Sequence, residues 1–331
     1  MKNRVLVIGS NSFSGSHFAL ELIRKGFEVL GVSRSERPHE IFCPEIWKYE
    51  TKYSTNFVKI DLNHDLDKLE DLFESFMPNY IVNFASQGMV AESWTKPLDW
   101  FQTNLMAQIR VIEKLKNYKN LIKFVHISTP EVYGNTENSI KENNTFSPST
   151  PYAVSRAAFD LHLLTYFKEY DFPVIFTRAA NVYGPGQQLY RIVPRAVLAC
   201  MFENKFPLHG GGISKRSFVY IDDLVEATEK IMVAGKIGEV YHISSDNLMP
   251  IKSIVDLVAQ KYGKRLHDIC FDHFERQGKD DSYSLNSSKI RRDLNWKENI
   301  SIEKGISNIV KWGKIHEKEI LKLPWNYAHK T

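Results

Sequence analysis

The sequence predicts an α/β protein with a doubly wound parallel sheet and a smaller C-terminal lobe, and three observations support this fold class. Short β-branched runs alternate with helical patterns from the first residues onward. A glycine-containing loop, "GSNSFSG" (9–15), separates the first run from the first helical pattern. After residue 180 the elements become shorter, and the loops become rich in Gly, Pro and Gln. Strands that alternate with helices favour a parallel sheet covered by helices on both faces.

The first strand is expected in "RVLVIG" (4–9), a continuous apolar run typical of a strand buried on both faces. A helix is expected over 14–26, where Phe18, Leu22 and Ile23 recur at helical spacing and Gly26 ends the pattern. Further strands are expected at 27–33, 57–62, 80–86, 123–129 and 173–180, and helical patterns separate most of them.

The loop at 9–15 joins the first strand to the first helix. Gly9 allows a tight turn there, and Gly15 allows the helix to pack closely on the sheet. The start of a helix offers free N–H groups and a partial positive charge, which suit a pyrophosphate. The position of this loop therefore predicts a dinucleotide site.

The end of the second strand bears on the choice of cofactor. An acidic residue there would bind the ribose 2′-hydroxyl and favour NAD, but this strand ends in Ser33 and Arg34. A hydroxyl and a guanidinium suit a 2′-phosphate, because arginine binds phosphate through two parallel hydrogen bonds. We therefore expect NADP, with NAD as the close alternative if Arg34 is only a solvated loop residue.

Two lobes are expected because the elements become shorter and the loops richer in Gly, Pro and Gln after residue 180. Residues 1–180 would form the dinucleotide-binding domain and residues 181–331 the smaller lobe, with the ligand site in the cleft between them. The run "SFVYIDD" (217–223) looks like another buried strand, so segments near 210–245 are candidates to return to the first domain.

Composition narrows the class of partner. The 331 residues are 43% hydrophobic and 25% charged, and the net charge of +4 permits an anionic small ligand without indicating nucleic acid or a membrane. The sequence has no apolar run of about 18 residues and no signal-peptide pattern. The three cysteines are few and far apart, which fits neither a disulfide framework nor a metal site. We expect a cytoplasmic protein without a metal.

Two stretches near the middle of the chain carry candidate catalytic groups. "HISTPEVYG" (126–134) ends an apolar run with Thr129 and Glu131, and "STPYAVSR" (149–156) places Arg156 four residues after Tyr152. Residues four apart share a helix face, so Arg156 can lie beside the Tyr152 ring, where its permanent charge would favour the phenolate. His126, inside the apolar run, is expected to be a core histidine rather than a base.

Together, "GSNSFSG", "HISTPEVYG" and "YAVSR" resemble the motifs of an extended short-chain dehydrogenase/reductase of the nucleotide-sugar epimerase/dehydratase group, whose larger domain is a Rossmann fold. Within this group the chain is most similar to 4,6-dehydratases of nucleoside-diphosphate sugars, including the dTDP-glucose and GDP-mannose enzymes. The similarity continues through "RAANVYGPGQ" (178–187), "GGGISKRSFVYIDD" (210–223), "ERQGKD" (275–280) and "SSKIRRDLNW" (287–296).

The resemblance implies a role for each matching position. The catalytic residues would be Thr129, Glu131, Tyr152 and Arg156. The cofactor-binding residues would be Gly9, Asn11, Ser12, Phe13, Ser14, Gly15, Ser33, Arg34, Asp61, Leu62, Phe84, Ala85, Ser86, Thr103, Tyr152, Arg156 and Val182. The residues that bind the nucleoside-diphosphate sugar would be Gln87, Thr129, Asn181, Arg191, Ile192, Pro207, Leu208, His209, Arg216 and Asn247.

The resemblance also implies a reaction and an assembly. Tyr152 would take the proton of the C4 hydroxyl while hydride leaves C4, Glu131 would take the C5 proton, water would leave from C6, and the hydride would return to C6. The segments 99–115 and the helix after Tyr152 carry apolar residues on more than one side, and by resemblance they would form a homodimer interface.

The chain departs from the family pattern in four places. Ser12 replaces the middle glycine of the fingerprint, Pro130 stands where the dTDP-glucose enzymes have aspartate, and Arg156 replaces the usual lysine. Asp281 and Ser282 occupy a place where an arginine for the diphosphate is common. Two alternatives therefore stay open. One is a C4 epimerase of such sugars, in which Glu131 would be structural, and the other is a non-catalytic sensor of the dinucleotide or nucleotide sugar.

Overall fold

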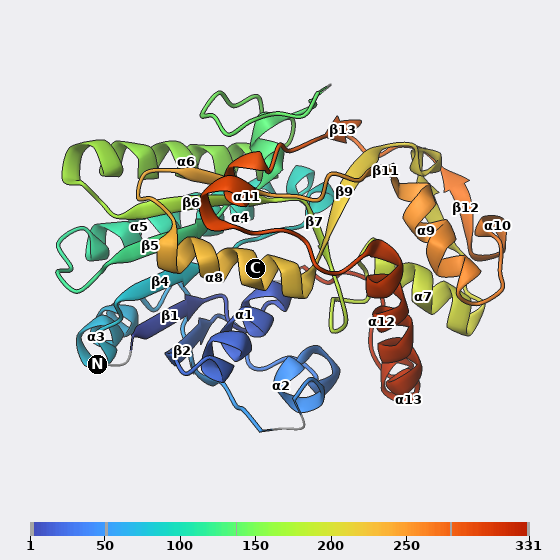
Figure 1. Ribbon diagram of the computed structural model, residues 1–331, viewed down its shortest axis with the longest axis horizontal. Helices are drawn as coiled ribbons and strands as arrows, with labels where there is room; N and C mark the ends of the chain where they lie inside the picture. Colours follow the sequence, from blue (N-terminus) through green and yellow to red (C-terminus); the bar gives the residue numbers. More distant parts are fainter. Residues whose placement is uncertain (1–2, 50–51, 137, 279, 330–331) are drawn as a thin grey trace.

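A large parallel sheet forms the centre of the molecule (Figure 1). The structure is a computed structural model that describes residues 3–49, 52–136, 138–278 and 280–329. Within these residues the sheet has seven parallel strands in the order β10-β6-β5-β4-β1-β2-β3. Their bounds are β1 Arg4–Ile8, β2 Glu28–Ser33, β3 Asn56–Lys59, β4 Tyr80–Asn83, β5 Lys123–Ile127, β6 Val174–Ala179 and β10 Val240–Ile243. The predicted α/β class with a doubly wound parallel sheet is confirmed.

The two faces of the sheet are buried in two hydrophobic clusters. Successive side chains of a strand point to opposite faces, so Val5 and Val7 of β1 enter one cluster while Leu6 and Ile8 enter the other. The first cluster includes helices α1 (Phe13–Arg24) and α8 (Ile221–Ala234). The second includes helices α3 (Leu66–Phe76), α5 (Ala107–Leu115) and α6 (Pro151–Tyr170). This double burial explains the continuous apolar strands in the sequence.

The strand order reverses between β1 and β4. From β1 the chain builds outward to β2 and β3, and it then returns to β4 on the other side of β1 before continuing to β5 and β6. In open sheets of this kind, ligands bind beyond the carboxyl ends of the strands at the reversal. The loops after β1, β4 and β5 therefore define the region in which a site is expected.

The second half of the chain builds two smaller sheets and then rejoins the large one. One sheet joins β7 (Asn181–Tyr183), β9 (Lys215–Tyr220), β11 (Leu248–Pro250) and β13 (Ser282–Tyr283), and the other pairs β8 (Phe206–His209) with β12 (Cys270–His273). The strand that contains "SFVY" is β9, which lies in the smaller sheet, whereas β10 pairs with β6 in the large sheet. The proposed division near residue 180 has to assign β10 to the first part.

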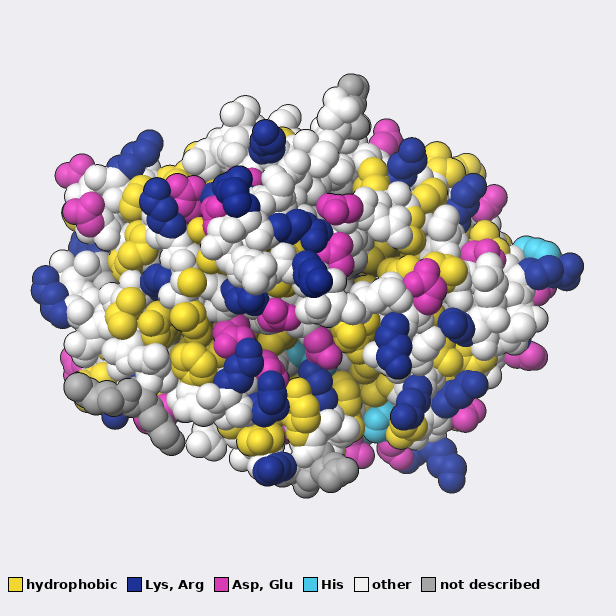
Figure 2. Space-filling model, viewed as in Figure 1, with side chains coloured by type: hydrophobic (Ala, Val, Ile, Leu, Met, Phe, Trp, Pro, Cys, Tyr) yellow, Lys and Arg dark blue, Asp and Glu magenta, His cyan; other side chains and the backbone are white. Residues whose placement is uncertain are grey.

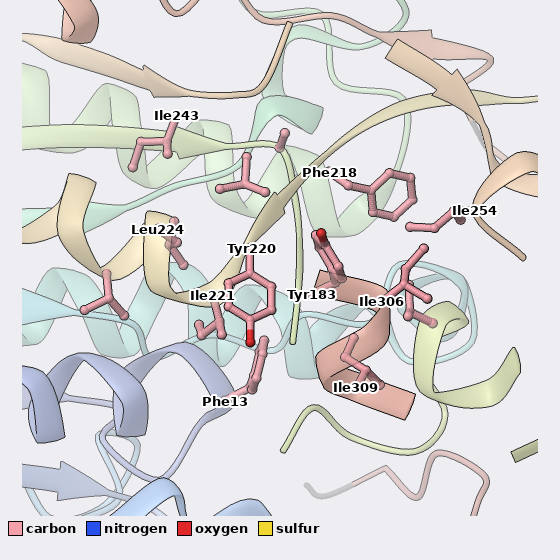
Figure 3. Close-up of a cluster of buried hydrophobic side chains, with 14 of the residues drawn as sticks. Phe13, Tyr183, Phe218, Tyr220, Ile221, Leu224, Ile243, Ile254, Ile306 and Ile309 are labelled. Atoms are coloured by element: carbon pink, nitrogen blue, oxygen red, sulfur yellow. The ribbon is translucent and has the colours of Figure 1, made fainter. Parts of the chain in front are cut away.

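An aromatic cluster joins the two parts. The Tyr183 ring lies 5.6 Å from the Tyr220 ring and 6.1 Å from the Phe218 ring, measured between centroids. Figure 3 shows Phe13, at the start of α1, gathered with Tyr220 and Ile221 where β9 leads into α8. The first turn of the dinucleotide-type helix is thus packed directly against the strand that carries Arg216.

The remaining elements are short or cover the smaller sheets. They are η1 Glu40–Phe42, α2 Pro44–Trp47, η2 Ala91–Trp94, α4 Pro97–Phe101, the π-helical η3 Gln102–Met106, η4 Pro130–Tyr133, α7 Ile192–Phe202, η5 Gly210–Gly212, α9 Ile251–Gln260, α10 Leu266–Ile269, α11 Ser288–Leu294, α12 Ile302–Ile315 and α13 Glu317–Ile320. Among the described residues, no helix is both long and apolar enough to span a membrane. Figure 2 shows Lys and Arg interspersed with Asp and Glu over one face, in keeping with the small net charge.

Candidate active site

The loop after β1 has the backbone geometry that its glycines predict. Gly9 has φ of 83°, a value that favours glycine, and a Cβ there would lie 2.7 Å from the Ala85 nitrogen beyond β4. A Cβ on Gly15 would overlap the Gly9 carbonyl oxygen. Both positions therefore need glycine for close approach, one to the neighbouring strand and the other within the loop.

Ser12 has a role that a glycine at its position would lack. Its hydroxyl donates to the Gly9 carbonyl oxygen at 2.6 Å and accepts the Gly15 N–H at 3.2 Å, so Ser12 caps α1. The N–H groups of the next residues, Phe13 and Ser14, lie in the first helical turn, where no intrahelical acceptor exists. This capped helix start fits the pyrophosphate of a dinucleotide.

The end of β2 is tied to the same loop. The Ser33 hydroxyl accepts the Asn11 N–H at 2.8 Å, and the Asn11 side-chain amide donates to the Ser35 carbonyl oxygen at 3.0 Å. Ser33 therefore shapes the loop as well as standing where an acid would favour NAD. Arg34 follows at the carboxyl end of the strand and is partly buried. It is close enough to Tyr327 to affect the pKa of that phenol.

The other residues expected to bind the cofactor follow the carboxyl ends of neighbouring elements. Leu62 is buried and Asp61 partly buried beyond β3, and the Asp61 carboxylate accepts the Asn63 N–H at 2.9 Å. Thr103 lies in η3, where its hydroxyl accepts from the Asn63 amide at 3.4 Å. η3 is a π-helical turn within a longer helical segment, and such turns are frequent at functional sites. The residues beyond β4 and in β7 are Phe84, Ala85, Ser86 and Val182, of which Ser86 is exposed.

Thr129 and Glu131 lie on a short 3₁₀ helix beyond β5. Thr129 is its N-cap, and its hydroxyl accepts the Glu131 N–H at 3.3 Å. Pro130 occupies the first helical position, where a proline is favoured because no N–H is needed. Glu131 is partly buried on this rigid turn. Pro130 thus fixes the turn that carries the carboxylate, although it supplies no acid of its own.

Tyr152 and Arg156 lie in the first turns of α6. Thr150 caps this helix by accepting the Ala153 N–H at 3.1 Å, which places Tyr152 just inside the helix start. Tyr152 is 9% exposed, packs with Trp100 of α4, and hydrogen-bonds the Thr129 side chain. Arg156 is 2% exposed, and its Nη2 donates to the Ile127 carbonyl oxygen at the end of β5.

The electrostatics bring these four residues into one site. Burial raises the pKa of Glu131 to about 7, while the positive charge of Arg216 opposes that rise. Burial also raises the pKa of Tyr152; the charge of Arg156 and the hydrogen bond from Thr129 lower it, whereas the charge of Glu131 raises it further. Thr129, Glu131 and Arg156 all act on the Tyr152 phenol, so the structure brings the predicted catalytic set together.

Some of the residues expected to bind the substrate surround Glu131 and Tyr152. Arg191 precedes α7 and acts electrostatically on both groups. The Arg216 guanidinium lies 4.0 Å above the Tyr283 ring and donates to the Asp280 carbonyl oxygen at 2.7 Å. Asn181 accepts a hydrogen bond from the Tyr283 hydroxyl at 3.1 Å. The guanidinium groups of Arg191 and Arg216 thus both act on the candidate catalytic carboxylate, and such groups are suited to an anionic diphosphate.

The other residues expected to bind the nucleoside-diphosphate sugar lie in β8, before β11, after β4 and at the start of α7. Pro207, Leu208 and His209 belong to β8 of the two-stranded sheet, where His209 Nδ1 lies 3.0 Å from the Phe274 carbonyl oxygen. Asn247 is exposed just before β11. The last two residues of the set are Gln87, which is buried with its N–H bonded to the Asn104 amide oxygen at 2.7 Å, and the partly buried Ile192.

Two residues near the site were missed in the sequence. Burial raises the pKa of Tyr283 to about 12, and its ring supports Arg216. Asp280 is buried and acts electrostatically on Glu131, and burial raises its own pKa. They are the first and last residues of the run "DDSY" (280–283), where the sequence drew attention only to the missing arginine. Their distance from residue 131 along the chain left no local signal.

A capped dinucleotide-type loop after β1 and a tyrosine–arginine pair on α6, both at the carboxyl edge of one parallel sheet, are the arrangement of an extended short-chain dehydrogenase/reductase. Within that class, the GDP-mannose 4,6 dehydratase family matches residues 6–309, and the chain belongs to this family.

Known relatives point in the same direction. The chain is 31% identical over 329 residues to the dTDP-glucose 4,6-dehydratase of Haemophilus influenzae, covering 93% of this chain and 97% of that protein. It is 28% identical over 320 residues to the human dTDP-D-glucose 4,6-dehydratase, covering 93% of this chain and 89% of that protein.

Solved structures include both dehydratases and epimerases. A double mutant of the dTDP-glucose 4,6-dehydratase of Streptomyces venezuelae, solved with NAD bound, superposes with a TM-score of 0.87 at 26% identity and covers 96% of this chain and 98% of its own. The UDP-glucose 4-epimerase of Thermotoga maritima, solved with UDP-glucose, superposes with a TM-score of 0.85 at 25% identity and covers 95% of this chain and 99% of its own. The cofactor in the dehydratase structure is NAD.

Proposed function

We propose that this protein is a nucleoside-diphosphate-sugar 4,6-dehydratase. The observation that carries the proposal is that Glu131 acts electrostatically on Tyr152 within one site, where the guanidinium of Arg191 acts on both and that of Arg216 acts on Glu131. A phenol held near a cation and a carboxyl group of raised pKa are suited to two different proton transfers in one pocket. The named relatives, most of them dTDP-glucose 4,6-dehydratases, support the same reaction.

The dinucleotide would lie along the loop after β1 and would, when bound, accept a hydride and return it. Residues of this loop and of the strand ends beyond β2, β3 and β4 would hold it, with Phe13 and Ser14 offering N–H groups to the pyrophosphate. We propose NADP as the preferred form and NAD as the alternative, because Arg34 follows β2 where no acid is present. Related structures contain NAD, which has no 2′-phosphate, and this supports NAD as the alternative.

The chain's own residues account for the proton transfers. Tyr152, as phenolate, would take the proton of the C4 hydroxyl, and Thr129 would hold the phenol in place. The 4-keto group acidifies the C5–H bond, so that Glu131 can take that proton and water can leave from C6. Burial gives Glu131 a pKa of about 7, so its carboxylate and carboxylic acid forms are both populated near neutral pH. Glu131 is therefore able to take the C5 proton and to protonate the departing C6 hydroxyl. Pro130, which has no acidic side chain, cannot protonate that hydroxyl.

A homodimer is also proposed. Two apolar side chains of α6, Val154 and Leu161, are 39% and 49% exposed, and Met106 of η3 and Leu98 of α4 are 44% and 79% exposed. Large apolar side chains on adjoining helices favour a protein partner. A second copy of the chain, packing these helices against their counterparts, would cover them.

The alternative function is a C4 epimerase. Pro130 favours it, because epimerisation needs no acid for a leaving hydroxyl, and the Thermotoga maritima epimerase shows that this fold supports that reaction. A mass-spectrometric screen of nucleoside-diphosphate hexoses with the purified protein distinguishes the functions. Loss of one water supports the dehydratase, and unchanged mass with inverted C4 supports the epimerase. Cofactor binding without turnover of any sugar would support the sensor and contradict both enzymes.

A further inference from the structure

Arg156 is a buried cation in the first turns of α6. In the described parts of the chain it forms no ion pair, although it is only 2% exposed. Its Nη2 donates to the Ile127 carbonyl oxygen and lies 3.4 Å from Nε2 of His126. A buried guanidinium without a carboxylate in contact is costly, so its surroundings must explain why it stays apart from one.

The carboxylate that could neutralise Arg156 lies one imidazole ring away. Asp160 is fully buried and accepts hydrogen bonds from the Ser128 hydroxyl and from Nη2 of Arg178, both at 2.8 Å. Its other oxygen lies 3.3 Å from Nε2 of His126, the same atom that approaches Arg156. Asp160 and Arg156 are four residues apart on α6, a spacing that permits a direct ion pair on a helix. Instead, each of them is close to Nε2 of His126.

The charges of this cluster do not balance without Tyr152. Arg156 and Arg178 are cations, and Asp160 is the anion, because Arg178 and His126 outweigh burial and hold its pKa at about 2. His126 is neutral near pH 7, since burial lowers its pKa to about 4. One positive charge is left over, and the Tyr152 phenolate would balance it. The other groups that act on the Tyr152 phenol are Glu131 from η4, Arg191 before α7, Tyr283 from β13 and the Thr129 hydroxyl.

We propose that His126 is a positioning residue that keeps Arg156 beside Tyr152 by separating it from Asp160. The inference rests on the proposed function, in which Tyr152 must act as a phenolate. A direct pair between Arg156 and Asp160 would draw the guanidinium toward the carboxylate and reduce the positive potential at the phenol. Nε2 of His126, which is close to both groups, would hold them apart.

The test is the ionisation of Tyr152, followed through the ultraviolet absorbance of tyrosinate. The spectrum of each protein is compared with that of its Tyr152→Phe counterpart over a pH series, so that only Tyr152 contributes to the difference. His126→Ala allows Arg156 to pair with Asp160, and the midpoint for Tyr152 should rise by about one pH unit, which is the size of shift that a nearby charge produces. Adding Asp160→Asn removes the attraction, and the midpoint of the double variant should return to the native value or below it.

Two further variants keep the result interpretable. His242→Ala removes another buried histidine of the same region, one that lies 2.9 Å from the Tyr133 hydroxyl rather than next to Arg156, and should leave the midpoint unchanged. If His126→Ala does not fold, Asp160→Asn alone is measured, and the account then requires a lower midpoint. An unchanged midpoint in His126→Ala, or an equal rise in the double variant, would overturn the inference. Because the measurement needs no substrate, a protein that turns over no sugar yet shows the shift would refute only the proposed function.

Discussion

The Thr129 hydroxyl accepts the N–H of Glu131 at 3.3 Å, and this bond holds the candidate acid–base group at the start of a 3₁₀ helix. Pro130 lies between the two and removes an N–H that the helix start does not need. The residue that looked least suited to the chemistry in the sequence is therefore the one that stiffens the turn beneath Glu131. Because Pro130 has no acidic side chain, Glu131 itself must both take the C5 proton and protonate the C6 hydroxyl.

Replacing Glu131 with glutamine should separate the two halves of the reaction. The amide keeps the shape of the side chain but cannot take the C5 proton, so reduced cofactor should accumulate while water is retained. Absorbance of the reduced nicotinamide and the mass of the sugar nucleotide measure the two events in one experiment. Full dehydration by Glu131→Gln would show that another group carries out the elimination. The epimerase would then become the favoured function.

The pH dependence of elimination should report the raised pKa of Glu131. The carboxylate is the form that takes the C5 proton, and burial places its pKa at about 7, so the rate of elimination should rise as pH increases through 7. Single-turnover measurements between pH 5.5 and 8.5, roughly one to two units on either side of that pKa, test this expectation. A rate already at its plateau at the lowest pH would mean that Glu131 has an ordinary pKa or is not the base.

Replacing Tyr152 with phenylalanine should abolish oxidation at C4, because no phenolate remains to take the hydroxyl proton. We expect a loss of roughly 10²-fold or more in the rate of cofactor reduction, the range found when a general base is removed. Thr129→Val is the matched comparison: it removes the hydrogen bond to the phenol but leaves the base, so its loss should be smaller. Equal losses in the two variants would contradict a separate role for the phenolate.

The cofactor preference should depend on Arg34. The native protein should bind NADP(H) more tightly than NAD(H), and Arg34→Ala should remove most of the difference, roughly 10- to 100-fold for a charge-assisted hydrogen bond. Arg37→Ala serves as the control, since that arginine is paired with Glu45. Titration of protein fluorescence with each cofactor gives the dissociation constants. Tighter binding of NAD(H) by the native protein would show that Arg34 does not bind the 2′-phosphate of the ribose.

Stability should fall as the solution becomes acidic below the ordinary pKa of histidine. Burial lowers the pKa of His126 to about 4 and that of His242 to about 3, so both are neutral in the folded protein and take up protons on unfolding. The unfolded state therefore binds more protons between about pH 6.5 and pH 4, and stability is lost as pH falls through this window. Each group contributes a slope of about 1.4 kcal/mol per pH unit.

Urea unfolding at several pH values measures this slope. His242→Gln should flatten it by about the contribution of one histidine, whatever its effect on stability at pH 7. His267, which is exposed beside Asp268, provides the matched control for replacing a histidine with glutamine. A slope unaffected by His242→Gln would show that this ring is protonated in the folded protein.

Local patterns predicted much of the first half of the fold, because β1, β4 and β5 are largely buried apolar runs, whereas the edge strand β3 is short and mostly exposed. The place of β10 was harder to see. Its neighbour β6 lies some sixty residues earlier in the chain, and "EVYHISS" has no feature that says which sheet it joins. The choice is made by packing between distant segments.

The site shows the same limit. The spacing of Tyr152 and Arg156 predicted a shared helix face, whereas the hydrogen bond of Tyr152 to Thr129 depends on where β5 ends. The position of His126 close to both Arg156 and Asp160 follows from how β5 packs on α6, and neither segment reveals it alone. Motifs identify chemical groups, whereas the burial that tunes them belongs to the assembled fold.

The most direct test of the dehydratase account uses a nucleoside-diphosphate hexose labelled with deuterium at C4. If Tyr152 and Glu131 act in sequence as described, the label leaves C4, water is lost, and the label is found on the C6 methyl group of the 4-keto product. Mass spectrometry of sugar fragments locates it. Label that is still at C4 in a product of unchanged mass would contradict the account and would establish an epimerase instead.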